Sequence, residues 1–128
     1  MQIQLLCHLF GDYLLQSSWM ANNKTKRWIP AIAHALVYFL PFLVMLQPSL
    51  NASIVMIGTH LLIDRFRLAR YIAYIKNFLA PICEWKPWSD CKETGNHKDT
   101  PPFLAVWLMI ICDNTMHLII NAVALAYL

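Results

Sequence analysis

Long apolar stretches alternate with short polar segments along the chain. Between Trp28 and Ile63 the sequence holds no Asp, Glu, Lys or Arg, and between Phe103 and Leu128 the only such residue is Asp113. A helix that crosses a bilayer needs about 20 mostly apolar residues. The pattern therefore predicts four helical spans, with approximate bounds 1–21, 28–47, 52–79 and 103–128.

The segments between these helices consist of helix-breaking residues. Asn22-Asn23-Lys24 follows the first helix, and a short stretch around Pro48 follows the second. A polar loop of about 80–102, which contains several prolines and Gly95, separates the third helix from the fourth. We therefore predict an all-α fold, a four-span transmembrane helical bundle that forms a single integral-membrane domain over 1–128.

The composition points the same way. Hydrophobic residues make up 59% of the chain and charged residues 13%, whereas a soluble domain is roughly 45–50% apolar and about 25% charged. With three glycines in all, a glycine-rich phosphate loop is excluded. The lipid bilayer is the expected partner, and no nucleic acid is expected, because membrane topology accounts for the basic residues.

The ten basic residues define the orientation. Lys24, Lys26 and Arg27 lie between the first two helices, and the other seven lie at or beyond the end of the third helix. Lys and Arg in short loops stay on the cytoplasmic side of a membrane. Both termini are therefore predicted outside, and the 80–102 loop inside.

Ionisable side chains within the predicted spans carry the candidate chemistry, because such groups are rare there and mark functional sites by default. They form three pairs with a four-residue spacing: His8 with Asp12, His60 with Asp64, and Asp113 with His117. This spacing places both members of a pair on one helical face. In the first two pairs His precedes Asp, and in the last pair Asp precedes His. Because the fourth helix should run antiparallel to the first and third, this reversed order places all three histidines in one layer and all three aspartates in another.

The depth of these groups suggests a metal site. Counted from the outer membrane surface, the three histidines lie at about 9–12 Å and the three aspartates at about 15–18 Å. We expect His8, His60 and His117 to bind a divalent metal, zinc first, with Asp12, Asp64 and Asp113 as further ligands or as the catalytic base. Two metal ions, or Mn or Fe instead of zinc, also fit these ligands.

Other polar residues have a less defined role. His34 lies at about 21 Å depth, and Gln16 and Asn121 continue the helical faces of two pairs. Hydrogen-bonded packing between helices is an alternative reading of all these groups. In the loop, Cys83, Cys91 and His97 form an incomplete zinc set whose role stays open.

Several blocks of sequence resemble a known family. Cys7-His8-Leu9-Phe10-Gly11-Asp12-Tyr13-Leu14-Leu15-Gln16, continuing through Trp19-Met20-Ala21 to Lys24, is similar to the opening signature of a bacterial and phage membrane family, domain of unknown function 3307. The blocks 34–38, 60–64 and 113–117 are similar to its other polar blocks, in order. A Gln often found beside the family's last Asp is replaced here, since Cys112 precedes Asp113. The resemblance implies a small multi-span protein of the bacterial inner membrane with a shared polar core, and it names no reaction.

Three functions remain open at this point. The first is a metal-dependent membrane hydrolase that acts on a lipid-like substrate. The second is a proton- or metal-conducting homo-oligomer, in which histidines relay protons. The third is a non-enzymatic phage or bacterial membrane factor that binds host proteins through its basic loops.

Overall fold

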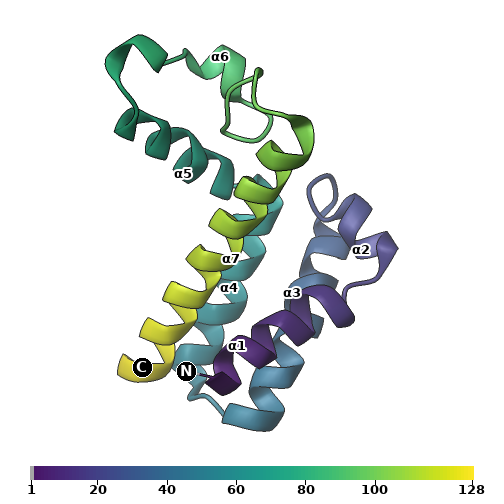
Figure 1. Cartoon of the computed structure of the whole chain (residues 1–128). Coiled ribbons are helices and arrows are strands. Elements are labelled where there is room, and N and C mark those ends of the chain that lie inside the picture. The colour runs from purple at the N-terminus through teal and green to yellow at the C-terminus, as the bar shows by residue number, and fades with distance from the viewer. Residues whose placement is uncertain (1) are drawn as a thin grey trace. The chain divides into compact units, whose positions relative to one another are not determined.

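The computed structural model describes residues 2–128, which form helices and turns and contain no strand (Figure 1). The prediction of an all-α fold is therefore confirmed. Contacts divide the chain into two compact units. The first comprises the chain up to Arg67 together with His117–Leu128, and the second is Leu68–Met116. The prediction of one integral-membrane domain over 1–128 stays a prediction.

The first unit contains most of the helices. They are α1 (Gln2–Leu9), the π-helix η1 (Phe10–Leu14), α2 (Ser18–Asn23), α3 (Trp28–Leu46), α4 (Leu50–Phe66) and the last residues of α7 (Pro102–Tyr127). Two of these helices begin at serine caps, where Ser17 and Ser49 accept backbone hydrogen bonds at 3.3 and 3.1 Å. Such caps satisfy amide groups that the first helical turn leaves unpaired.

The first predicted span, 1–21, is interrupted; its first residue lies outside the described residues. After α1 the chain forms the wider π-helix, in which Leu15 N donates to Phe10 O at 3.0 Å. Leu15–Ser17 are then non-helical before α2 starts. Gly11 accounts for the local geometry, because its missing side chain lets η1 approach the backbone of α3 at Tyr38.

The third predicted span, 52–79, ends early. Arg67 adopts the left-handed conformation with φ of 52°, and its amide donates to Asp64 O and Ile63 O. A left-handed residue stops a helix and satisfies its last carbonyls. The chain resumes in the second unit as α5 (Ala69–Ile75) and the 3-10 helix η2 (Lys76–Leu79).

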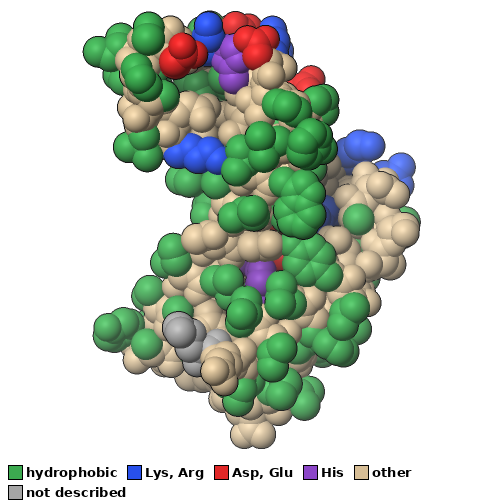
Figure 2. Space-filling model, viewed as in Figure 1, with side chains coloured by type: hydrophobic (Ala, Val, Ile, Leu, Met, Phe, Trp, Pro, Cys, Tyr) green, Lys and Arg blue, Asp and Glu red, His purple; other side chains and the backbone are tan. Residues whose placement is uncertain are grey.

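The second unit also holds the 3-10 helix η3 (Ile82–Glu84), α6 (Trp88–Cys91) and the first part of α7. Aromatic rings hold α5 to α6, where Tyr71 stacks on Trp88 with centroids 5.0 Å apart. Charged side chains gather around α6 (Figure 2). There Lys98 forms an ion pair with Asp90 at 2.9 Å and lowers the pKa of that carboxyl.

Two of the described helices are long and apolar enough to cross a membrane. They are α3 and α7, with 19 and 26 residues. The helix α4 is also rich in apolar residues but has 17. These features are a weak indication of a membrane protein, because the buried core helix of a soluble protein can show them too.

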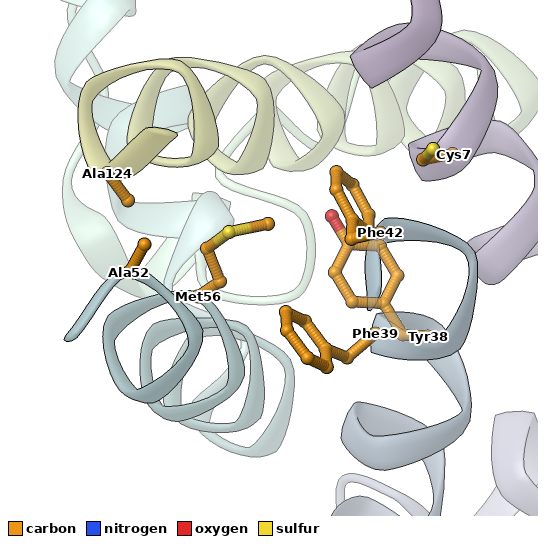
Figure 3. Close-up of a cluster of buried hydrophobic side chains, with 7 residues drawn as sticks. All are labelled: Cys7, Tyr38, Phe39, Phe42, Ala52, Met56 and Ala124. Atoms are coloured by element: carbon orange, nitrogen blue, oxygen red, sulfur yellow. The ribbon is translucent and has the colours of Figure 1, made fainter. Parts of the chain in front are cut away.

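An apolar cluster in the first unit supports the polar site described below. Figure 3 shows its members, which are Cys7, Tyr38, Phe39, Phe42, Ala52, Met56 and Ala124. They come from α1, α3, α4 and α7, so the cluster joins the four helices. Tyr38 is fully buried and belongs to both the apolar cluster and the polar site.

Candidate metal centre

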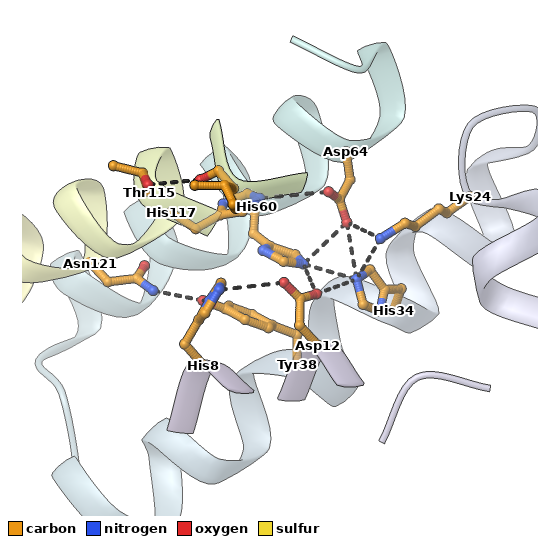
Figure 4. Close-up of polar contacts among 11 residues, drawn as sticks. His8, Asp12, Lys24, His34, Tyr38, His60, Asp64, Thr115, His117 and Asn121 are labelled. Carbon is orange, nitrogen blue, oxygen red and sulfur yellow. Dashed lines mark hydrogen bonds and ion pairs between the residues drawn. The ribbon is translucent and has the colours of Figure 1, made fainter. Parts of the chain in front are cut away.

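Four buried acidic and imidazole side chains converge inside the first unit (Figure 4). Asp12 comes from η1, His34 from α3, and His60 and Asp64 from successive turns of α4. Their side chains are at most 10% exposed. Three separate elements therefore direct charged or imidazole groups toward one point, away from solvent.

The distances within this group are short. His34 Nε2 lies 3.2 Å from Asp12 Oδ1, 3.0 Å from Asp64 Oδ2 and 3.0 Å from His60 Nε2. His60 Nε2 lies 3.3 Å from Asp64 Oδ2 and 3.8 Å from Asp12 Oδ1. Around a tetrahedral zinc ion with bonds near 2.0–2.1 Å, neighbouring ligand atoms are about 3.3 Å apart. The four side chains are therefore spaced as ligands of one ion would be.

The second oxygen of each carboxylate faces a further histidine. Asp12 Oδ2 lies 3.7 Å from His8 Nε2, and Asp64 Oδ1 lies 3.6 Å from His117 Nε2. Each aspartate thus turns one oxygen toward the centre and the other toward an outer imidazole. Groups that flank metal ligands in this way fix their orientation and tune their basicity.

Tyr38 connects this polar group to α7. Its hydroxyl oxygen accepts a hydrogen bond from Asn121 Nδ2 at 2.7 Å and lies 2.9 Å from His8 Nδ1. Because the hydroxyl retains a proton of its own, it can donate to His8 Nδ1, which leaves the proton of a neutral ring on Nε2, facing Asp12. The Tyr38 ring also stacks on His60, with centroids 3.6 Å apart and planes at 7°. Tyr38 therefore orients two histidines at once.

Removing this hydroxyl should cost stability. We expect Tyr38→Phe to lower the free energy of unfolding by about 1–3 kcal/mol, because two buried polar groups lose a partner while the ring keeps its packing. Tyr127→Phe removes the same atom at a position that is 82% exposed and should change little. Chemical unfolding followed by circular dichroism measures both variants, and equal stabilities would contradict the role of Tyr38.

Lys24 also reaches the centre. Its Nζ donates to Asp64 Oδ2 at 2.8 Å and lies 3.1 Å from His34 Nε2. With neutral histidines, the group of Asp12, Asp64 and Lys24 carries two negative charges and one positive charge. Buried charge is costly unless it is compensated, so the centre favours additional positive charge.

The structure brings most of the residues predicted from the sequence into this region. The rings of His60 and His117 are 4.3 Å apart, and those of His8 and His117 are 6.0 Å apart. The four converging side chains, however, include His34, while His8 and His117 flank them. Asp113 lies on α7 one turn before His117 and is partly buried.

The remaining candidates have different surroundings. Asn121 is buried and bound to Tyr38, as described above, whereas Gln16 lies in the non-helical link after η1 and is half-buried. In the loop, His97 pairs with Asp99 at 3.1 Å. Cys91 is buried and Cys83 exposed. Among residues 2–128, the groups able to share a metal ion do not include these loop residues.

Lys24 was not predicted as a site residue, because basic residues beside a predicted span were attributed to the orientation of the chain in the membrane. From the sequence, Tyr38 was considered only as a hydrogen-bond partner of His34, which lies four residues before it on the same buried face of α3, and not as a site residue.

Fold and site together define a helical protein with a buried Asp/His cluster that could hold a divalent metal ion. Over residues 1–128 the chain matches the family described as Protein of unknown function (DUF3307), and it belongs to that family. No curated protein and no solved structure matches the chain.

Proposed function

We propose that the protein binds one divalent metal ion within the group of Asp12, His34, His60 and Asp64 and acts as a metal-dependent hydrolase in the membrane. One observation carries the proposal: four buried ligand atoms from three elements all lie within 4.8 Å of one another, and the histidine nitrogens are 3.0–3.8 Å from the carboxylate oxygens and from each other. Zinc is the first candidate, because imidazole and carboxylate ligands suit it.

The distances suggest how the roles divide. His34 Nε2, His60 Nε2 and Asp64 Oδ2 form the tightest triangle, with sides of 3.0–3.3 Å. Catalytic zinc sites keep three protein ligands and one open position. Asp12 Oδ1 lies farther from His60 Nε2, at 3.8 Å, than Asp64 Oδ2 does, and Asp12 has the more exposed carboxylate of the two. We therefore assign the triangle as ligands and Asp12 as the general base.

A cation held by this triangle would polarise a substrate oxygen and make a bound water acidic enough to lose its proton near neutral pH. Asp12 would accept that proton through Oδ1. His8, 3.7 Å from Asp12 Oδ2 and bound to Tyr38, would keep the carboxylate in place. The arrangement suits hydrolysis of an ester, amide or phosphate bond.

The distribution of side chains supports a membrane location. The polar side chains of His8, His34 and Asn121 are buried in the first unit, whereas large apolar residues such as Leu6, Val44 and Ile54 are 60–74% exposed. Extensive exposed apolar surface is unusual for a soluble monomer. We propose that α1 with η1, α3, α4 and α7 cross a bacterial inner membrane, with both termini outside, and that the substrate is lipid-like because the site lies among these helices.

Replacing the proposed base tests the reaction. We expect Asp12→Asn to lower the turnover of a bacterial lipid extract by at least about 100-fold, because general bases contribute 10²–10⁴-fold, while about one zinc ion per chain is retained. Mass spectrometry of the products and elemental analysis of the purified protein measure the two quantities.

Asp99→Asn is the matched control, because it removes one carboxylate that is 86% exposed. It should leave turnover unchanged. Unaltered turnover in Asp12→Asn, or zinc-loaded wild-type protein that releases no product, would contradict the hydrolase. Proton flux through proteoliposomes without hydrolysis would instead favour conduction.

A further inference from the structure

Lys24 stands between the proposed metal ligands and the surface. Its side chain is 18% exposed, whereas the side chains of Asp64 and His34 are 5% and 0% exposed. Its ammonium group contacts both of those residues, at 2.8 and 3.1 Å. In Figure 4 the lysine approaches the cluster from one side, and its ammonium group ends beside Asp64 and His34.

The loop that carries Lys24 is attached to the helix that carries Asp64. The guanidinium of Arg65 donates to the carbonyl of Thr25, and at 3.4 Å to that of Lys26. The same guanidinium lies 5.1 Å from the ring centroid of Trp28. Arg65 directly follows Asp64 in the chain, so these contacts hold the loop beside the carboxylate that Lys24 binds.

The ammonium and a metal ion would compete for the same two atoms. Asp64 Oδ2 and His34 Nε2 both contact Lys24 Nζ and both belong to the proposed metal-binding group. An ion bound to these atoms at about 2.0–2.2 Å would lie within a few ångströms of Nζ. Two cations so close in a buried site repel each other strongly.

The charge balance of the site favours exchange of the lysine ammonium for the metal ion over simultaneous binding of both. Asp12 and Asp64 contribute two negative charges, which one divalent ion balances. Adding the lysine charge to the loaded site would leave an excess of one positive charge, whereas the lysine alone leaves one negative charge uncompensated. A buried site is most stable when its charges balance.

We propose that Lys24 is an internal cation that exchanges with the divalent metal ion. In the metal-free protein its ammonium holds Asp64 and His34, and metal binding displaces the side chain toward solvent. This exchange weakens metal binding and selects for divalent over monovalent ions, which offer no charge advantage over the ammonium. The proposal rests on the metal centre put forward as the proposed function.

Zinc titration against a competing chelator tests the exchange. We expect Lys24→Met to bind zinc at least about tenfold more tightly than the wild type, because the competing charge is gone. Lys26→Met is the matched control, since Lys26 lies on the same loop with an exposed side chain. It should keep the wild-type affinity, and Lys24→Arg, which retains the charge, should show no gain.

Two results would overturn the proposal in different ways. If the wild type binds zinc and Lys24→Met binds it equally or more weakly, the exchange is wrong and the metal centre stands. If neither protein binds zinc, the metal centre itself is wrong. Should Lys24→Met require zinc to remain folded, the rate of zinc withdrawal by a chelator replaces the titration: slower release than from the wild type supports exchange, and equal or faster release overturns it.

Discussion

Replacing Asp64 by Asn is expected to lower the affinity for zinc by more than about 100-fold, because even residues that only support metal ligands contribute 10–100-fold. Oδ2 of Asp64 lies 3.0 Å from His34 Nε2 and 3.3 Å from His60 Nε2, so it is central to the group. An amide keeps the size of this side chain but removes its charge. Chelator-competition titration with zinc measures the loss.

The same charge can be removed elsewhere as a control. Asp99→Asn changes the net charge by the same amount in the second unit and should bind zinc as the wild type does. An unchanged affinity in Asp64→Asn would show that zinc, if bound, lies at another place. The metal centre would then have to be abandoned.

Gly11→Ala is expected to lower the free energy of unfolding by about 3 kcal/mol, at the upper end of the usual cost of overpacking. A Cβ atom at this position would lie 2.6 Å from the carbonyl oxygen of Tyr38 and 3.0 Å from its Cα. These are backbone atoms of α3, so the clash cannot be relieved by turning a side chain. Because Asp12, the proposed general base, directly follows Gly11, the variant should also hydrolyse its substrate more slowly.

Gly58→Ala provides the matched control within α4. A Cβ atom there meets nothing within 4 Å, and alanine in a helix interior is more favourable than glycine by about 0.5–1 kcal/mol. This variant should therefore be as stable as the wild type or more stable. Chemical unfolding of both variants measures the difference, and equal effects of the two substitutions would contradict the close approach of η1 to α3.

The sequence predicted much of the site because its spacing has a direct structural meaning. Residues four apart share a helical face, so His60 and Asp64 were expected to point together, and they lie 3.3 Å apart. The reversed order of the pair on α7 predicted a common layer. In the structure His117 does lie beside His60 and Asp64.

The central position of His34 could not be derived in this way. Its partners Asp12, His60 and Asp64 come from other elements, and none lies within a helical turn of it in the sequence. Only the packing of α3 against η1 and α4 brings them together. The role of Lys24 could not be predicted for a similar reason, because its contact with Asp64 joins residues that are 40 positions apart in the sequence.

Helix ends were predicted well where the sequence contains a helix-breaking residue such as proline. They were predicted poorly where a change of backbone conformation ends the helix without such a residue. Pro48 marks the end of α3, which the structure places at Leu46. The left-handed conformation that ends α4 occurs at Arg67, and no glycine or proline lies there to indicate a helix end, so the helix was predicted to continue. The apolar pattern also continues through the interruption at Leu15–Ser17 and gives no sign of the π-helix before it.

X-ray absorption at the zinc edge of the purified, zinc-loaded protein tests the metal centre most directly. We predict nitrogen and oxygen ligands at about 2.0–2.2 Å, with scattering from two imidazole rings. His34→Ala should lose the bound zinc, whereas His97→Ala, which removes a histidine of the second unit, should give the wild-type spectrum. A sulfur shell near about 2.3 Å, or a wild-type spectrum from His34→Ala, would contradict the account.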